Sequence, residues 1–380
     1  EYCNCASQNK NCYLCFSTNH CEDCYYGSWI NYSKDCVDNE NCMYNELCYE
    51  TNDCEKCYHA IYSEECHNCS DVYFSKACVG CKNIMFCTNL KNAEYHISNK
   101  KVSPDEFEEF RKNMDLGSYK KFRECVKKFE EMKGGMIVKE YHGTNNENVT
   151  GNDISNCKNS FDAYMANDCE DVMHCSNLEA GVKNCMDYSY WGSKAERIYE
   201  CQACGYDLFN LRFCNLCWSG CSDLTYCDHC FSSKNCFGCV GLKKAKYCIL
   251  NKQYSKEEYE GLVPRIIEQM KGTGEFGEFF PEKFSVFAFN ETLAVEYAPL
   301  TEEAARARGY SWKDIQSVYD YQGPVVEIPD HINYAPDTIT QQILTCEKSN
   351  KLYKIIPQEL KFLKRMGLPA PRRSPDQRHF

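Results

Sequence analysis

Cysteines over the first 87 residues of the chain are spaced by three residues or a multiple of three. Only Cys5 departs from this spacing, and the other positions of the series hold mostly small or apolar residues such as Ala60 and Val72. Neither an α-helix, with a period of 3.6 residues, nor a β-strand, with a period of 2, produces this pattern. A backbone that turns after every third residue does produce it. The sequence therefore predicts a β-solenoid in which one residue in three points inward.

The repeat of paired cysteines indicates the length of one coil. Three pairs recur every 12 residues, namely Cys54/Cys57, Cys66/Cys69 and Cys78/Cys81. We therefore expect coils of about 12 residues with four inward positions, stacked at the spacing of neighbouring strands, about 4.8 Å. The second half of the chain keeps the same three-residue step but contains single-residue insertions, so some of its coils should be longer by one residue.

The two halves are copies of one another. Positions between Cys69 and Ser103 recur between Cys221 and Ser255 at a constant offset, and many of the paired residues are identical. We expect a mainly β chain made of two tandem β-solenoids with helical caps. Its expected parts are a first cysteine-lined solenoid over 1–102, a helical cap and linker over 103–145, a second cysteine-lined solenoid over 146–253, a helical cap over 254–271, an aromatic-rich irregular and helical segment over 272–345, and a small α/β segment over 346–380.

Each solenoid is followed by a sequence typical of a capped helix. Ser103 with Glu106 and Ser255 with Glu258 have the spacing of a capping box, in which each side chain bonds the other residue's backbone N–H. A further helix should end near Gly134. Because a repeat array exposes apolar surface at its ends, we expect these helices to cover it.

Three stretches, residues 237–259, 278–291 and 356–379, carry a resemblance to a known family. The chain resembles the cysteine-rich repeat proteins of uncultured candidate-phylum bacteria, which have no established activity and are often labelled as CoA-transferases. The resemblance covers nearly the whole chain. No motif in this sequence supports CoA-transferase chemistry.

The resemblance implies that residues 346–380 form a treble-clef-like finger. Of the four ligand positions of such a finger, only Cys346 is a cysteine here, and Ser349, Ser374 and Gln377 occupy the others. One thiolate cannot hold a structural zinc ion, so we expect a degenerate finger without metal. The resemblance also implies that flanking parts are missing at both ends, in line with a first residue, Glu1, that is not Met.

The inward cysteines have four competing interpretations. They could be free thiols that act as small apolar residues, because Ala, Val, Ser and Thr occupy equivalent positions. They could instead form disulfides across a thin coil, with Cys36–Cys42 and Cys48–Cys54 as the obvious pairs. Redox catalysis is the weakest interpretation, since pairs such as Cys21-Glu-Asp-Cys24 lie among acids that raise a thiol pKa.

Metal binding is the fourth interpretation. Two sets of four cysteines share the spacing C-x2-C-x5-C-x2-C, and four thiolates suit zinc. The period of three generates such pairs without any metal, which weakens the signal. The candidate ligands are Cys12, Cys15, Cys21 and Cys24 in the first half, and Cys227, Cys230, Cys236 and Cys239 in the second.

The leading functional hypothesis is a non-enzymatic repeat scaffold that binds a protein or glycan through outward aromatic side chains. The candidate surface residues are Tyr25, Tyr26, Tyr49, Tyr58, Tyr62 and Tyr73. The alternative for these tyrosines is that they cover the backbone or meet the other half of the chain. No phosphate loop, nucleophile elbow or HExxH motif indicates an enzyme, and no cofactor is expected unless the cysteines hold zinc.

A nucleic-acid or ribosome-associated role is the second hypothesis. The net charge of −12 argues against a phosphate-binding surface over most of the chain, but the C-terminal segment is basic. Its candidate contacts are Arg372, Arg373 and Arg378, together with Lys361, Lys364 and Arg365. A metal-binding or thiol-redox sensing protein is the third hypothesis. No run of 18 apolar residues suggests a membrane span, and we expect a cytoplasmic protein.

Overall fold

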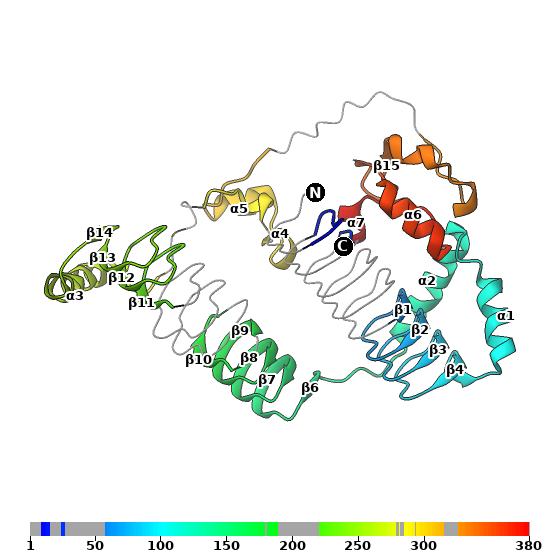
Figure 1. Ribbon diagram of the computed structural model, residues 1–380, viewed down its shortest axis with the longest axis horizontal. Helices are drawn as coiled ribbons and strands as arrows, with labels where there is room; N and C mark the ends of the chain where they lie inside the picture. The colour runs from blue at the N-terminus through cyan, green and yellow to red at the C-terminus, as the bar shows by residue number, and fades with distance from the viewer. Residues whose placement is uncertain are drawn as a thin grey trace. The chain divides into compact units, whose positions relative to one another are not determined.

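The computed structural model describes residues 9–15, 24–26, 58–178, 181–188, 220–278, 281, 285–292, 294–314 and 326–379. The chain divides into two compact units, residues 1–137 with 316–380, and residues 138–315 (Figure 1). Both contain mostly parallel sheets of short strands together with helices. The fold is mixed α/β, so the expectation of a mainly β chain was too narrow. No helix among the described residues is both long enough and apolar enough to cross a membrane.

The sheet of the first unit confirms the expected spacing of its strands. Tyr58 pairs with Ser70, Ser70 with Lys82, and Lys82 with Glu94, always in parallel. A short antiparallel strand ends the sheet at Lys100. The strands are β1 (Tyr58–Ile61), β2 (Ser70–Tyr73), β3 (Lys82–Met85), β4 (Glu94–Ile97) and β5 (Lys100–Lys101).

The period of three has a backbone cause. The residue that precedes an inward position repeatedly has a positive φ, as at Glu65 (51°) before Cys66 and at Asn68 (53°) before Cys69. A left-handed residue turns the chain, and Asn and Asp tolerate this conformation better than other non-glycine residues. The frequent Asn and Asp residues just before inward positions are therefore a sequence signal for the turn.

The described residues of the second unit form two such sheets, and the register of the first confirms that the spacing between successive strands is unequal. Glu147 pairs with Lys158, Lys158 with Glu170, and Glu170 with Lys183, so the step grows along the chain. The strands are β6 (Gly143–Thr144), β7 (Glu147–Ser155), β8 (Lys158–Asn167), β9 (Glu170–Leu178) and β10 (Lys183–Met186), then β11 (Ser222–Thr225), β12 (Lys234–Phe237), β13 (Lys246–Ile249) and β14 (Lys252–Gln253).

The register shift in β7 lies next to Gly151. Gly151 has a φ of 130°, and a Cβ atom there would lie 1.7 Å from the carbonyl oxygen of Ala163 on β8. Only glycine allows the two backbones to approach this closely while the strand absorbs the irregularity.

The predicted helices are confirmed. Both capping boxes form, at Ser103 ahead of α1 (Pro104–Met114) and at Ser255 ahead of α3 (Lys256–Thr273). Between them, α2 (Tyr119–Gly134) ends at the expected glycine and buries Phe122, Val126 and Phe129. We call the sheet β1–β5 the first array, and the sheets β6–β10 and β11–β14 together the second array. The helices cover parts of these arrays because the outward residues beneath them are apolar.

The segment expected to span 272–345 is divided between the two units. Its first part, with η2 (Phe289–Glu291), α4 (Ala294–Tyr297) and α5 (Glu302–Ala307), belongs to the second unit. The remainder joins the C-terminal segment in the first unit. There lie η3 (Ile332–Tyr334), η4 (Asp337–Gln341), β15 (Leu344–Thr345), β16 (Leu352–Tyr353), α6 (Pro357–Met366) and α7 (Pro375–His379).

Candidate functional site

The cysteines of the described residues are free thiols. All are buried except Cys125 on α2, which is partly exposed, and none of them lies in a disulfide. This part of the chain therefore agrees with the interpretation of the inward cysteines as small core residues. The disulfide candidates Cys36–Cys42 and Cys48–Cys54 lie outside the described residues.

Inward thiols have a defined hydrogen-bonding role. The Sγ of Cys69 donates to the carbonyl oxygen of His67 at 3.3 Å or to that of Cys78 at 3.4 Å, and it accepts from the backbone N–H of Cys81 at 3.3 Å. Cys157 and Cys239 likewise donate to a carbonyl oxygen and accept from a backbone N–H. A small side chain that both donates and accepts can link successive repeats, because its sulfur supplies an acceptor for a backbone N–H of the next repeat.

Serine takes the place of cysteine at positions where the side chain both donates to a carbonyl oxygen and accepts from a backbone N–H. Ser233 donates to the carbonyl of Phe231 at 3.0 Å and accepts from the N–H of Ala245 at 3.1 Å. In the column that contains Cys69 and Cys81, alanine stands at Ala93, where no further coil follows. In this column of both arrays, cysteine or serine accepts from a backbone N–H of the next repeat, and alanine stands at the end of the array.

Among the described residues, the candidate metal ligands form no metal site. Cys21 lies outside the described residues, and Cys12, Cys15 and Cys24 are buried free thiols, as are Cys227, Cys230, Cys236 and Cys239. Over the ranges that the structure describes, no group of three or more Cys, His, Asp or Glu side chains is arranged to hold a metal ion. The geometry gives the zinc hypothesis no support in these residues.

Neighbouring thiols nevertheless influence one another. Hydrogen bonds from Cys227 and Cys236 lower the pKa of Cys239, and the bond with Cys239 raises the pKa of Cys236. In the first unit, hydrogen bonds from Cys15 and Cys24 lower the pKa of Cys12 in the same way. Ionisation of one thiol in each group therefore depends on hydrogen bonds from its neighbours.

The tyrosines that we expected on an exposed surface are mostly internal. Tyr25 and Tyr73 are each only 3% exposed, and Tyr26 and Tyr62 are partly buried. The ring of Tyr62 packs edge-on against Phe122 and Phe129 of α2. Tyr58 is exposed, and Tyr49 lies outside the described residues. The prediction of exposure was wrong for Tyr25 and Tyr73, because helices and the C-terminal segment cover this face.

The sequence contained a signal for this cover. One outward position of every coil in the first half is apolar, at a constant spacing of 12 residues. A continuous outward apolar stripe predicts a covered face rather than a solvated one. The positions are Tyr13, Tyr25, Val37, Tyr49, Ile61, Tyr73, Met85 and Ile97.

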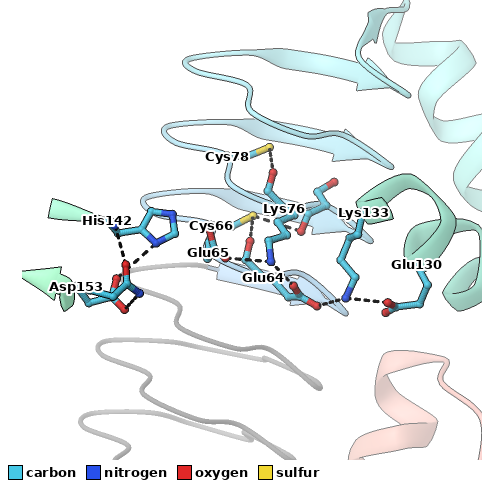
Figure 2. A network of polar contacts seen from close by, with 11 residues as sticks. Glu64, Glu65, Cys66, Lys76, Cys78, Glu130, Lys133, His142 and Asp153 are labelled. Carbon is cyan, nitrogen blue, oxygen red and sulfur yellow. Dashed lines mark hydrogen bonds and ion pairs between the residues drawn. The ribbon is translucent and has the colours of Figure 1, made fainter. Parts of the chain in front are cut away.

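A network of ion pairs connects α2 to the first array. Figure 2 shows Lys133 of α2 and Lys76 of the array both directed at Glu64, at 2.7 Å and 2.9 Å. Lys133 also contacts Glu130 at 2.9 Å, and Lys76 contacts Glu65 at 3.0 Å. Burial of Glu64 opposes its ionisation, but the two lysines outweigh it and lower the pKa of this carboxyl. The network positions the helix and leaves none of these charges free for a ligand.

The basic C-terminal residues are also engaged inside the first unit. The Arg378 side chain is 4% exposed and pairs with the buried Glu359 at 2.8 Å. Arg373 contacts Glu347 at 3.2 Å, and the Arg372 guanidinium lies 4.5 Å from the ring centroid of Tyr119. Lys364 pairs with Asp337 at 2.6 Å, Arg365 lies over the Phe362 ring, and Lys361 is exposed. Each of these residues except Lys361 therefore has a partner within the first unit, but Lys364 and Arg365 remain exposed. The prediction that Arg378 is exposed was wrong.

Three of the four finger positions come together. Burial raises the pKa of the Cys346 thiol, but hydrogen bonds from the Ser349 hydroxyl and from the backbone N–H groups of Ser374, Ser349 and Lys348 outweigh burial and lower it to about 6. β15 and β16 form the antiparallel hairpin around this turn. Gln377 lies on α7. The local geometry places backbone donors around one sulfur.

An exposed apolar surface that the sequence analysis missed lies on the second array. Met173 and Met186 are 41% and 38% exposed, and they occupy the same strand position as each other on β9 and β10. Phe161 of β8 pairs with Met173 and is partly exposed. The related strand sequences KNSF, EDVM and KNCM could have indicated this row of apolar residues.

No protein-family model matches the chain, and no curated protein is significantly similar to it.

Proposed function

We propose that the chain is a non-enzymatic repeat scaffold in which two tandem β-solenoids with short coils present a protein-binding surface. The observation that carries this proposal is the exposed row of Phe161, Met173 and Met186 on the second array. Contiguous apolar surface is unfavourable in water and commonly marks an interaction site. The surface replaces the tyrosine face of the first array, which is largely occupied by the chain itself.

The use of the cysteines agrees with a structural role. Their thiols hydrogen-bond to backbone groups of the same and neighbouring coils, as a core residue does. Such thiols stabilise a rigid framework, and rigidity lowers the entropic cost of binding a partner.

Selection from a displayed peptide library tests the proposal. Clones that bind the wild-type chain should lose binding to the double variant Met173→Asp/Met186→Asp. They should keep binding to Leu250→Asp, which adds the same kind of charge at a residue that is 75% exposed in the same unit. If the selected clones bind all three proteins equally, the surface is not the binding site and the proposal fails.

The nucleic-acid hypothesis has less support, because Arg372, Arg373 and Arg378 are held by internal partners. Salt-dependent binding of RNA by the full chain, lost on replacing Lys361, would favour it again.

The metal-binding or thiol-sensing hypothesis rests on the interacting thiols around Cys12 and Cys239. Metal content and free-thiol count, measured together on protein purified without reductant and then unfolded, decide between it and a packing role. Stoichiometric zinc would favour the former, and reactive thiols matching the 32 cysteines without metal would favour the latter.

A further inference from the structure

The outward column at the fourth position of the strands is mostly apolar in both arrays, with Thr150 of β7 and Thr225 of β11 as exceptions. The opening four residues of the strands are closely related, for example SDVY in β2 and EDVM in β9, or KNIM in β3 and KNCM in β10. Register places successive fourth residues directly beside one another, as in Tyr73 with Met85 and Met173 with Met186. The same column can therefore be compared along the chain.

Helices cover this column in two stretches. In the first unit, Ile61, Tyr73 and Met85 are buried in one cluster with apolar residues of α1 and α2. In the second unit, Phe237 and Ile249 are buried together with Tyr259 of α3. In both stretches the fold covers the column with an amphipathic helix.

The stretch over β8, β9 and β10 has the same column without that burial. Met173 and Met186 keep about two fifths of their surface exposed, against 5% or less for the covered residues of the column. The exposed surface is thus part of a column that helices cover elsewhere in the chain. This continuity indicates a helix as the missing occupant.

The edge of the exposed column is acidic. Asp162, His174 and Asp187 directly follow Phe161, Met173 and Met186 along the chain. Hydrogen bonds from His174 and Tyr164 lower the pKa of Asp162, so its carboxylate is charged at neutral pH. At the equivalent places of the first array stand Phe74, which packs against Phe122 of α2, and Phe86, which packs against Phe110 of α1. An occupant of the second array must therefore complement negative charge at one edge.

Helix geometry fits the spacing of the column. Successive coils rise by about 4.8 Å, and one helical turn rises by about 5.4 Å. Apolar residues at i, i+4 and i+7 can therefore contact three neighbouring coils. Phe122, Val126 and Phe129 of α2, which are buried against the first array, have this spacing.

We propose that Phe161, Met173 and Met186 bind an amphipathic helix of a partner protein, with apolar residues at i, i+4 and i+7 and Lys or Arg along the edge that meets Asp162 and Asp187. This inference rests on the proposed protein-binding function and specifies the class of partner.

Fluorescence anisotropy with the full chain tests it. The probe is a labelled helical peptide of about four turns, with leucine at i, i+4 and i+7 and lysine along one edge, and a second peptide has glutamate in place of each lysine. We expect the lysine peptide to bind and the glutamate peptide to bind at least about tenfold more weakly. Met173→Asp/Met186→Asp should abolish binding although it adds negative charge, and Leu250→Asp should leave it unchanged. Asp162→Asn/Asp187→Asn should bring the two peptides to similar affinity.

Three results would overturn the inference. One is equal binding of both peptides by the wild-type chain. Another is unchanged binding by the methionine double variant, which would point to general attraction between a cationic peptide and an acidic protein. The last is concentration-dependent self-association that the methionine variant abolishes, since the surface would then bind a second copy. If library clones depend on Met173 and Met186 but neither helical peptide binds, the proposed function stands and only the helical partner is wrong.

Discussion

Arg378 and Glu359 form an ion pair in the interior of the first unit, with Nη1 of the arginine 2.8 Å from Oε1 of the glutamate and both side chains almost fully buried. The Tyr26 hydroxyl donates to the other carboxylate oxygen at 2.9 Å, and the guanidinium lies 4.8 Å from the centroid of the Tyr26 ring. Residues far apart in the sequence are thus joined at one charged centre. The pair connects α6 and α7 to the early coils of the array.

Removal of one partner should destabilise the first unit strongly. Arg378→Met leaves the Glu359 carboxylate buried without its counter-charge, which costs about 3–5 kcal/mol. Replacing both, as Arg378→Met/Glu359→Leu, should cost less because no uncompensated charge remains. Urea unfolding followed by far-ultraviolet circular dichroism measures the free energy of unfolding for each variant. A single variant as stable as the wild type would show that the pair does not fix the C-terminal segment.

Replacing an inward cysteine by valine should lower the stability of the chain by different amounts at different inward positions. Cys69→Val leaves the N–H of Cys81 without its acceptor and should cost about 1–3 kcal/mol, whereas Cys69→Ser keeps both contacts and should cost about 1 kcal/mol or less. Cys175→Val is the matched control, because the Cys175 thiol donates to carbonyl oxygens and the same column holds Ala163 on the neighbouring strand. Equal losses for Cys69→Val and Cys175→Val would contradict the proposed acceptor role.

Removing the N-cap of α1 and removing that of α3 should each affect the stability of a different unit. Ser103→Ala removes the capping box of α1 and Ser255→Ala that of α3, each at a cost of about 1 kcal/mol. Because the helices belong to different units, each substitution should lower the stability of its own unit. Hydrogen exchange resolved by peptide can follow β1–β4 and β11–β13 in each variant. Loss of protection over both sets from either substitution would mean that the units unfold together.

The sequence predicted the elements that depend on local pattern. The period of three, the spacing of the strands in the first array and both capping boxes follow from residues close together in the chain, and all are present. The exposure of outward side chains could not be predicted in this way, because it depends on contacts between residues that are far apart in the chain. Tyr25 and Tyr73 were assigned to solvent because they face outward from a coil, but α1, α2 and the C-terminal segment cover them.

The charged C-terminal residues illustrate the same limit. A basic stretch usually indicates a solvated face, and nothing near Arg378 in the sequence shows that Glu359 and Tyr26 enclose it. The exposed row on the second array could have been anticipated by comparing the strand sequences at their fourth positions. The sequence does not show, however, that Met173 and Met186 are exposed, because their exposure depends on contacts that only the structure shows.

Cys346 should make the stability of the first unit depend on pH. Hydrogen bonds lower the pKa of this thiol in the folded chain from an ordinary value of 9.0 to about 6. Between these values the unfolded chain binds more protons than the folded chain, so stability rises with pH from about 6 to 9 and is lost as the pH falls through 6. Across that window the wild type should gain up to about 4 kcal/mol relative to Cys346→Ser.

Urea unfolding at several pH values between 6 and 9 measures this difference. Cys125→Ser is the control, because burial raises the pKa of Cys125 and its ionisation therefore contributes no gain in this window. If the difference between the wild type and Cys346→Ser is the same at every pH, Cys346 is protonated in the folded chain and the backbone donors around it do not stabilise a thiolate. A difference that grows with pH would instead show that the hydrogen-bond donors around Cys346 stabilise its thiolate without requiring a metal.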